Sequence, residues 1–527
     1  MAKSTSTMVR HALFMMAGTF ASRILGLVRE VITAAWFGAT GILDAFNVAF
    51  TLANLARQML AEGALSASFV PVFSRVLASR DRTAAEKLAR QAFSVLLGAG
   101  LLAVFVGIIV SPVLVRIMAP GFDPVKTALA VSLTRWMFPF LLMVSMAALA
   151  MGVLNSLGSF LIPALAPALS NVIYIVMVIL FASSWGVWGL AAAVLAGGFC
   201  QFALQWGWTR KMGILLSPER PDLHDTDLRK MLSLFLPYAA GLSLNQVNPV
   251  LSRMLASFLQ EGAISVLNYA NRVIQLPLGL FVIAISQAVL PQLSRCASGE
   301  VDEFRDIMRD SLRFALFVVL PVTLGSVLVS REVIHLLFVR GAFGQWAWEG
   351  TARSLAMYSL GLPGMACSTV VMRGLYARSL PRAALKVTFS SVASTLLFSL
   401  VLMKPMSYGG LALATSLSFT LSGAVGAYLL SGNLGVRLGI FSVQWCAKMT
   451  GCLLATAGTV LAFTALMPYP AGEGIAFRSF WVFAVFFASA LVYGVFTWMM
   501  GFQEWRWIRG AVGRTSGGPV IKGEGEE

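Results

Sequence analysis

The chain has 527 residues, of which 58% are hydrophobic and 12% are charged, and its mean hydropathy is +0.80. Soluble domains carry about 25% charged residues, so this composition excludes a soluble globular protein. The net charge of +16 at pH 7 is compatible with binding to nucleic acid or to anionic lipid, depending on where the basic residues lie.

Apolar runs of the length needed to cross a bilayer, about 20 residues, recur from the N-terminus to near residue 501. Lipid offers the backbone no hydrogen-bond partners, so such runs must be helices; the alternating pattern of barrel strands is absent. The sequence therefore predicts an all-α polytopic membrane protein with about 14 transmembrane helices. The predicted spans are 11–38, 44–73, 91–115, 128–154, 160–182, 186–208, 231–257, 263–292, 311–330, 351–377, 384–403, 409–431, 441–467 and 479–501.

The first span contains Arg23, Arg29 and Glu30 in the sequence SRILGLVRE. It lacks a compact apolar core followed by a small-residue cleavage site, so we interpret it as a retained span and not as a signal peptide. Arg23 and Arg29 are about 9 Å apart along a helix axis and some 120° away from sharing a face. They can therefore flank a cavity without both pointing to its centre.

The second span contains four polar candidates, Asp44, Asn54, Arg57 and Glu62. Glu62 lies in AEGALS beside a glycine, where this span needs a bend. A structural hydrogen bond to neighbouring backbone and a role in gating are equally open for this carboxylate. The eighth span adds Asn271 and Arg272.

Four of these arginines are predicted to lie near the middle of the membrane: Arg23, Arg29, Arg57 and Arg272. A charged side chain at the bilayer centre costs at least about 2.5–3.5 kcal/mol, so the four must face a polar cavity or partners and not lipid. Three further arginines lie nearer span ends, where we expect them to extend to the interface: Arg135, Arg253 and Arg353.

The arginines have two possible roles. In the first, they pair with Glu30, Asp44 and Glu62 as buried links between spans, although adjacent residues on a helix point apart and an Arg29–Glu30 pair is expected to be poor. In the second, they bind an anionic substrate. Four arginines exceed three carboxylates, and guanidinium groups grip phosphate bidentately. We favour the second role.

The basic residues outside the predicted span interiors are distributed unevenly. If the N-terminus is cytoplasmic, 26 of the 39 Lys and Arg residues lie on the cytoplasmic side and six lie outside. This is the asymmetry of the positive-inside rule, and it places both termini in the cytoplasm. The net charge therefore reflects topology and contact with anionic membrane lipids and not nucleic-acid binding.

A weak internal repeat suggests the domain organisation. PVFSR at Pro71–Arg75 returns as PQLSR at Pro291–Arg295, and MGVLNS at Met151–Ser156 is loosely echoed by MRGLYARS at Met372–Ser379 with a similar offset. Parallel repeats of this kind are a transporter architecture. We predict two pseudo-symmetric six-helix lobes, an N-lobe over 1–230 and a C-lobe over 231–435, two extra helices over 436–501 and a cytoplasmic tail over 502–527.

Signals for catalysis and for cofactors are missing from the sequence. The five cysteines show no CxxC spacing and the three histidines are scattered, so neither a metal nor another cofactor is expected. There is no Walker loop and no HExxH motif, which argues against an enzyme. Energy for transport is then expected from an ion gradient, the membrane potential or the gradient of the substrate.

Several segments resemble one known family. SRILGLVRE, followed by FGATGILDAFNVAFTLANLARQMLAEGALSASFVPVF, is similar to the N-terminal signature of the MurJ/MviN lipid II flippases of the MOP exporter superfamily. Further similar segments are APGF at Ala119–Phe122, FPF at Phe138–Phe140, GVLNSLGSFLIPALAP at Gly152–Pro167 and NYANRVIQLPLGLF at Asn268–Phe281. The resemblance covers nearly the whole chain and is weakest after residue 440.

The resemblance implies two six-helix lobes around a central cavity, with two C-terminal helices that form a groove for a polyprenyl tail. The family's cavity arginines match Arg23, Arg29, Arg57 and Arg272, and its acidic positions match Glu30, Asp44 and Glu62. The chain departs from the pattern at Asn271, where several members have Asp, which puts an ion pair at this position in doubt.

We therefore expect a flippase that moves lipid II, the undecaprenyl-diphosphate-linked peptidoglycan precursor, between leaflets of the bacterial inner membrane by alternating access. Lipid II, membrane lipids and the cell-wall synthesis machinery are the expected partners, and nucleic acid is not. The alternatives are another MOP transporter, such as a polysaccharide-lipid flippase or a multidrug/cation antiporter, and a scaffold for envelope assembly that transports nothing.

Overall fold

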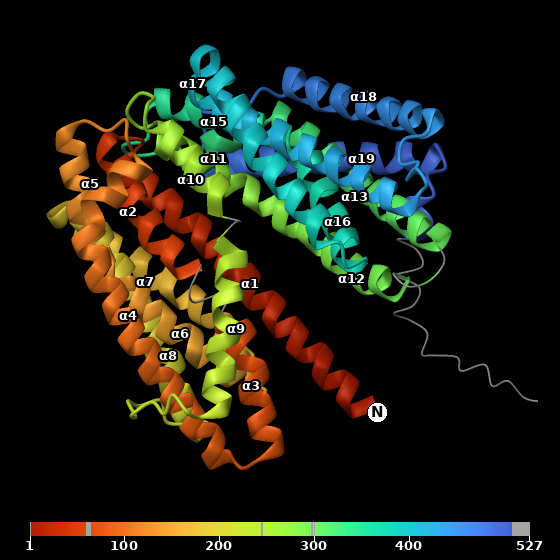
Figure 1. Ribbon diagram of the computed structural model, residues 1–527. Coiled ribbons are helices and arrows are strands. Elements are labelled where there is room, and N and C mark those ends of the chain that lie inside the picture. The colour runs from red at the N-terminus through yellow and green to blue at the C-terminus, as the bar shows by residue number, and fades with distance from the viewer. Residues whose placement is uncertain (1, 59–64, 244–245, 297–298, 300, 508–527) are drawn as a thin grey trace, which may run out of the picture. The chain divides into compact units, whose positions relative to one another are not determined.

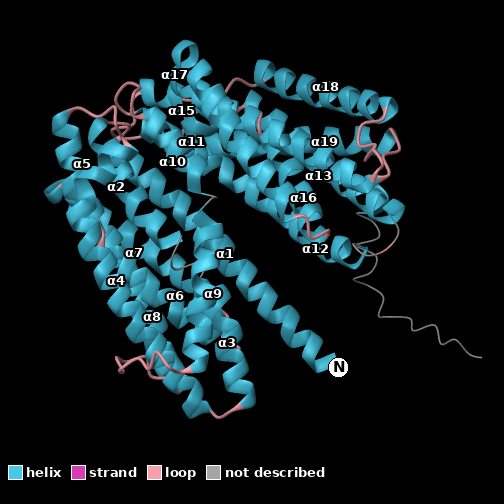
Figure 2. Ribbon diagram, viewed as in Figure 1, coloured by secondary structure: helices cyan, strands magenta, loops and turns pink. Residues whose placement is uncertain are grey.

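The computed structural model describes residues 2–58, 65–243, 246–296, 299 and 301–507. Figure 2 shows these residues as helices joined by loops, and none of them belongs to a strand. The chain forms two compact units. Unit 1 is Met1–Arg272, Phe338–Thr351 and Met406–Leu411, and unit 2 is Val273–Leu337, Ala352–Pro405 and Ala412–Glu527. The predicted all-α class is confirmed.

Ten helices and most of an eleventh lie in unit 1 (Figure 1): α1 (Ala2–Phe37), α2 (Gly41–Arg57), α3 (Ser66–Ser79), α4 (Arg82–Met118), α5 (Pro124–Met137), α6 (Pro139–Ser156), α7 (Leu161–Trp185), α8 (Val187–Lys211), α9 (Thr226–Ser243), α10 (Val247–Ala256) and α11 (Ala263–Pro277), which continues into unit 2. Unit 1 therefore extends beyond the predicted N-lobe boundary at residue 230. The two lobes, with their predicted bounds, stay a prediction.

The remaining elements lie mostly in unit 2. They are the π-helix η3 (Leu278–Ile283) and the helices α12 (Ala284–Cys296), α13 (Val301–Leu328), α14 (Ser330–Phe338), α15 (Gln345–Ser359), α16 (Leu362–Ala377), α17 (Pro381–Leu434), α18 (Val443–Leu466) and α19 (Ile475–Met499). Helix α17 covers two predicted spans, and its backbone breaks between them at Ser407, where φ is 52° and ψ is −133°.

The apolar runs form helices long enough to cross a membrane. Nine described helices meet the length and hydropathy of a span, or ten if the bent pair α15 and α16 counts as one. The chain is thus a multi-pass membrane protein. Its predicted number of about 14 spans stays a prediction.

Close helix packing in unit 1 depends on small residues. Helix α1 packs along α7, which in turn packs on α8. A Cβ added to Gly18 of α1 would lie 2.6 Å from the Cβ of Ala164 in α7, so only glycine permits this approach. Farther from this contact, the stacked rings of Phe69 and Phe73 on α3 are completely buried in a core shared with α4, α6 and α9. This packing fixes α1, which carries the predicted site.

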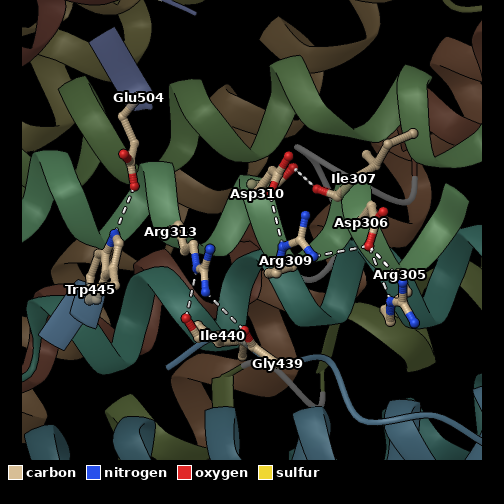
Figure 3. A network of polar contacts seen from close by, with 11 residues as sticks. Arg305, Asp306, Ile307, Arg309, Asp310, Arg313, Gly439, Ile440, Trp445 and Glu504 are labelled. Atoms are coloured by element: carbon tan, nitrogen blue, oxygen red, sulfur yellow. Dashed lines mark hydrogen bonds and ion pairs between the residues drawn. The ribbon is translucent and has the colours of Figure 1, made fainter. Parts of the chain in front are cut away.

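Figure 3 shows polar contacts between α13 and the segment before α18, and between α18 and the segment after α19. Arg313 of α13 donates from Nε to the carbonyl of Ile440 at 2.8 Å and from Nη2 to that of Gly439 at 3.1 Å, just before α18 begins. Trp445 of α18 donates from Nε1 to Glu504, a buried carboxylate beyond α19, at 2.8 Å. These bonds anchor the start of α18 to α13 and to the segment that follows α19.

Candidate anion-binding site

Arg272 approaches the first helix at a glycine. A Cβ built on Gly26 of α1 would lie 2.1 Å from Nη2 of Arg272, which projects from α11. The guanidinium therefore lies directly against the α1 backbone, in space that any other residue at position 26 would fill. The charges of Arg29, Glu30 and Arg23 all act on Arg272 here.

Arg29 is held by contacts from three sides. Its Nη2 lies 2.7 Å from Oε1 of Glu30, and its Nη1 lies 3.5 Å from Oδ1 of Asn171 in α7. Its guanidinium also stands 5.6 Å from the ring centroid of Phe50 and 5.1 Å from that of Tyr174. Cation–π contacts of this kind orient a guanidinium without neutralising its charge.

The expectation of a poor Arg29–Glu30 pair was wrong. Successive residues do leave a helix about 100° apart, but arginine and glutamate side chains are long enough to curve back and meet. Both are largely buried, with side-chain exposures of 18% and 11%. Burial favours the ion pair, because either charge alone would lose its hydration without gaining a partner of opposite charge.

Glu30 also connects α1 to α11. Its second oxygen, Oε2, lies 3.5 Å from Nδ2 of Asn268, at the long limit of a hydrogen bond. On the α7 side, Nδ2 of Asn171 donates to the carbonyl of Ser22 at 3.2 Å. The hydroxyls of Tyr174 and Thr33 lie 3.3 Å apart. The site is therefore a polar layer shared by α1, α7 and α11.

Arg57 ends α2, and its Nε donates to Oδ1 of Asn54 at 2.7 Å. The charge of Arg29 acts on Arg57, as it does on Arg272. Arg23, Arg29, Arg57 and Arg272 thus form an electrostatically connected group, which we call the arginine cluster. Asn271 is exposed beside Arg272 on α11. Glu62, the remaining predicted residue, lies outside the described residues.

Asp44 has a different environment. Its carboxylate accepts from the backbone N–H of Gly262 at 2.7 Å, from the N–H of Ser265 at 2.8 Å and from the Ser265 hydroxyl at 2.7 Å. These donors belong to the start of α11, so Asp44 caps that helix from α2. Asn47, one turn farther on, donates to the same hydroxyl at 3.1 Å. Asp44 therefore helps to place the helix that carries Arg272.

Three residues that surround Arg29 were not predicted from the sequence: Asn171, Tyr174 and Phe50. Asn171 could have been found as a lone amide within an otherwise apolar predicted span, where a polar side chain calls for a partner. Tyr174 follows it by three residues and so lies on the same helix face. The role of Phe50 has no sequence signal, because phenylalanine is common throughout this chain.

The arrangement has the chemistry of an anion site. Arg29 has a carboxylate partner in Glu30, whereas Arg272 has none at ion-pair distance among the residues that the structure describes. Guanidinium donors in such a layer match phosphate oxygens. Within the described part of the chain, no group of three or more His, Cys, Asp or Glu residues could hold a metal ion.

The family model described as lipid II flippase MurJ matches residues 33–480. The chain belongs to this family. Curated MurJ relatives include a probable lipid II flippase of Rhizobium tropici, 33% identical over 86% of each chain. The lipid II flippase MurJ of Burkholderia cenocepacia is 31% identical over 94% of this chain and 98% of that protein.

Solved structures show the same fold at lower identity. A MurJ structure in an inward closed conformation matches 95% of this chain and 100% of its own, with a TM-score of 0.75 and 22% identity. An inward-facing multidrug resistance MATE transporter of the MOP superfamily matches 80% of this chain and 98% of its own, with a TM-score of 0.67 and 14% identity. The fold is therefore that of MOP transporters.

Proposed function

We propose that this MurJ family member flips lipid II from the cytoplasmic to the periplasmic leaflet of the bacterial inner membrane. Family membership supports the substrate, since the relatives are named as lipid II flippases. One observation supports the site more than any other: the Arg272 guanidinium lies against α1 beside the paired Arg29 and Glu30. In this arrangement the guanidinium N–H groups are already positioned to donate hydrogen bonds to an anion.

In this mechanism the arginine cluster binds the diphosphate of lipid II. Arg272 contributes its donors directly, because no described carboxylate competes for them. Arg29 keeps Glu30 as its partner while the lipid is absent, and it shares its donors with phosphate when the lipid binds. Glu30 and Asn268 then hold α1 and α11 together around the occupied site. The buried setting strengthens each charge-assisted contact relative to water.

Transport then proceeds by alternating access, which exposes the arginine cluster first to the cytoplasmic side and then to the periplasmic side. Both termini are cytoplasmic in this proposal, in accord with the distribution of basic residues. The polyprenyl tail stays in lipid beside α18 and α19. Exposed apolar side chains on these helices suit a hydrocarbon chain, among them Leu454, Leu461, Phe483 and Phe487.

The alternative of a multidrug/cation antiporter, suggested by the similarity in fold to a multidrug resistance MATE transporter, fits the described carboxylates less well. A cationic drug needs an embedded acidic side chain that can exchange its partner for the drug. Glu30 is engaged by Arg29, and Asp44 accepts three hydrogen bonds from the start of α11. The charges that act on Arg272 are those of Arg29, Glu30 and Arg23, two positive and one negative, and together with Arg272 itself they disfavour a cation.

The test is translocation of fluorescent lipid II in proteoliposomes. We compare the wild-type protein with Arg272→Ala and Arg23→Ala, and use Arg382→Ala as a control because Arg382 is an exposed arginine at the start of α17. Each variant must keep the wild-type melting temperature in detergent. We expect both cluster variants to lose translocation and the control to keep it. If all three variants move lipid II like the wild type, the assigned site is wrong.

A further inference from the structure

A cavity lies away from the arginine cluster, between α4 and α5. It has a volume of about 720 Å³, and its lining includes Pro112, Arg116, Phe122, Thr127, Val131 and Arg135. Of the described residues that line it, none is acidic. Arg116 lies in the last turn of α4 and Arg135 in the last turn of α5. Two guanidinium groups therefore border one cavity without a carboxylate in its lining.

Arg135 is positioned by a gap in the α4 hydrogen-bond ladder. Pro112 has no N–H, so the carbonyl of Ile108 one turn earlier lacks its helical donor. Nε of Arg135 lies 3.4 Å from this carbonyl and donates to the Ser111 hydroxyl at 3.1 Å, while that hydroxyl donates to the same carbonyl at 2.8 Å. Arg135 was expected to extend to the interface. Its Nε is in addition bonded to α4, and its two terminal nitrogens make no hydrogen bond to the described residues.

The neighbouring aromatic residues indicate the depth of this cavity. Trp136, next to Arg135, packs edge-to-face on Trp188 with ring centroids 5.9 Å apart, and both rings are exposed. Exposed tryptophans gather at the level of lipid headgroups. Arg135 is therefore placed at the membrane interface. By the proposed orientation of the chain, this is the periplasmic interface.

An apolar stripe on α4 continues from the cavity toward the membrane interior. Leu102, Phe105, Ile109 and Val113 recur at helical spacing on one face, and all four are exposed. Arg116 follows Val113 by three residues and so extends this stripe. A ligand that spans both features would carry a phosphate at the arginines and a hydrocarbon chain along the stripe. A free phosphate would match the arginines alone.

We propose that this cavity binds the headgroup of an anionic phospholipid in the periplasmic leaflet. The phosphodiester lies between Arg116 and Arg135, and one acyl chain follows the apolar stripe of α4. The site is separate from the arginine cluster, so the proposal depends on the chain's orientation but not on its transport substrate. Both arginines are exposed, and a headgroup would reach them from the membrane without any rearrangement of the fold.

Native mass spectrometry of the full-length protein in detergent tests this site. The ligands are phosphatidylglycerol, phosphatidylcholine with the same acyl chains, and inorganic phosphate. The test variant is Arg116→Gln. The matched control is Lys404→Gln, which removes one charge from another exposed residue that is predicted to face the periplasm.

We expect Arg116→Gln to weaken phosphatidylglycerol binding about tenfold relative to Lys404→Gln, because it removes one set of charge-assisted hydrogen bonds. Phosphatidylcholine binding should be weak and similar in both variants, and inorganic phosphate should not displace the lipid. The proposal fails if the two variants bind phosphatidylglycerol equally. It also fails if phosphatidylcholine binds as well as phosphatidylglycerol, or if inorganic phosphate displaces the lipid. Arg116 makes no ion pair with the described residues, so its replacement should leave the melting temperature unchanged.

Discussion

Gly26 offers a way to displace Arg272 without removing it. In a Gly26→Ala variant, the new Cβ would lie 2.1 Å from Nη2 of Arg272. Ordinary contacts begin at 3.4 Å, so the guanidinium must retreat by about 1.3 Å. The obstructing atom is the far end of a flexible side chain, and the helix can therefore stay in place while the arginine moves.

The expected effect on lipid binding follows from that displacement. A charge-assisted hydrogen bond contributes about 1.5–3 kcal/mol, and it weakens steeply when its geometry is lost. Loss of the Arg272 contact should therefore raise the Kd for lipid II about tenfold to a hundredfold. The fold should not suffer, because alanine within a helix is favoured over glycine by about 0.5–1 kcal/mol.

The measurement is the Kd of purified protein for fluorescent lipid II in nanodiscs, together with the melting temperature. Gly98→Ala is the matched control, because a Cβ at Gly98 in α4 meets nothing within 4 Å. We expect the control to bind like the wild type. Should Gly26→Ala also bind like the wild type while the melting temperatures agree, the inferred contact between Arg272 and the diphosphate would be refuted.

Three further predictions concern stability. Asp44→Asn keeps one acceptor oxygen but loses the charge that caps α11, and should lower the free energy of unfolding by about 1–3 kcal/mol in denaturant titrations. Trp445→Phe leaves the buried Glu504 carboxylate without its indole donor, and should lower the melting temperature and speed proteolysis of the C-terminal segment. Burial, and secondarily the charge of Arg478, lowers the pKa of His335. Below about pH 6.5 the unfolded state therefore binds a proton more readily than the folded state, and acid favours unfolding. The wild type should therefore lose more thermal stability than His335→Gln between about pH 7.5 and 5.5.

Each of these outcomes can be contradicted. Equal unfolding free energies for Asp44→Asn and the wild type would mean that the cap on α11 is unimportant. Unchanged proteolysis of Trp445→Phe would mean that Glu504 does not hold the end of the chain. Parallel pH dependence of the wild type and His335→Gln would mean that the surroundings of His335, which include the Tyr469 hydroxyl at 3.1 Å and the charge of Arg478, do not disfavour its charged form.

The sequence predicted those features that depend only on a residue and its neighbours along the chain. A long apolar run must be helical in lipid, and an arginine within it needs polar partners. Both requirements hold independently of the rest of the sequence. These two statements predicted the all-α class and singled out Arg23, Arg29 and Arg272. They also predicted helices at positions where the structure has them, such as α7 and α19.

The sequence did not predict side-chain partners that belong to segments far apart in the chain. Asp44 is near Arg57 in the chain, yet its partners are Gly262 and Ser265, which tertiary packing brings to it. The Arg29–Glu30 pair depends on side-chain torsions that are set by Asn171 and the surrounding rings, and residue spacing does not encode these torsions. The same holds for Arg135, whose bond to α4 depends on the local backbone at Pro112.

The role assigned to Arg272 can be tested by varying the ligand together with the residue. Affinities of the wild-type protein and Arg272→Gln are measured in nanodiscs for undecaprenyl diphosphate and for undecaprenol, which has the same tail and no phosphate. Our account predicts that Arg272→Gln binds undecaprenyl diphosphate at least about tenfold more weakly than the wild type, and that the two proteins bind undecaprenol equally. An equal loss of affinity for both ligands, or no loss for either, would contradict it.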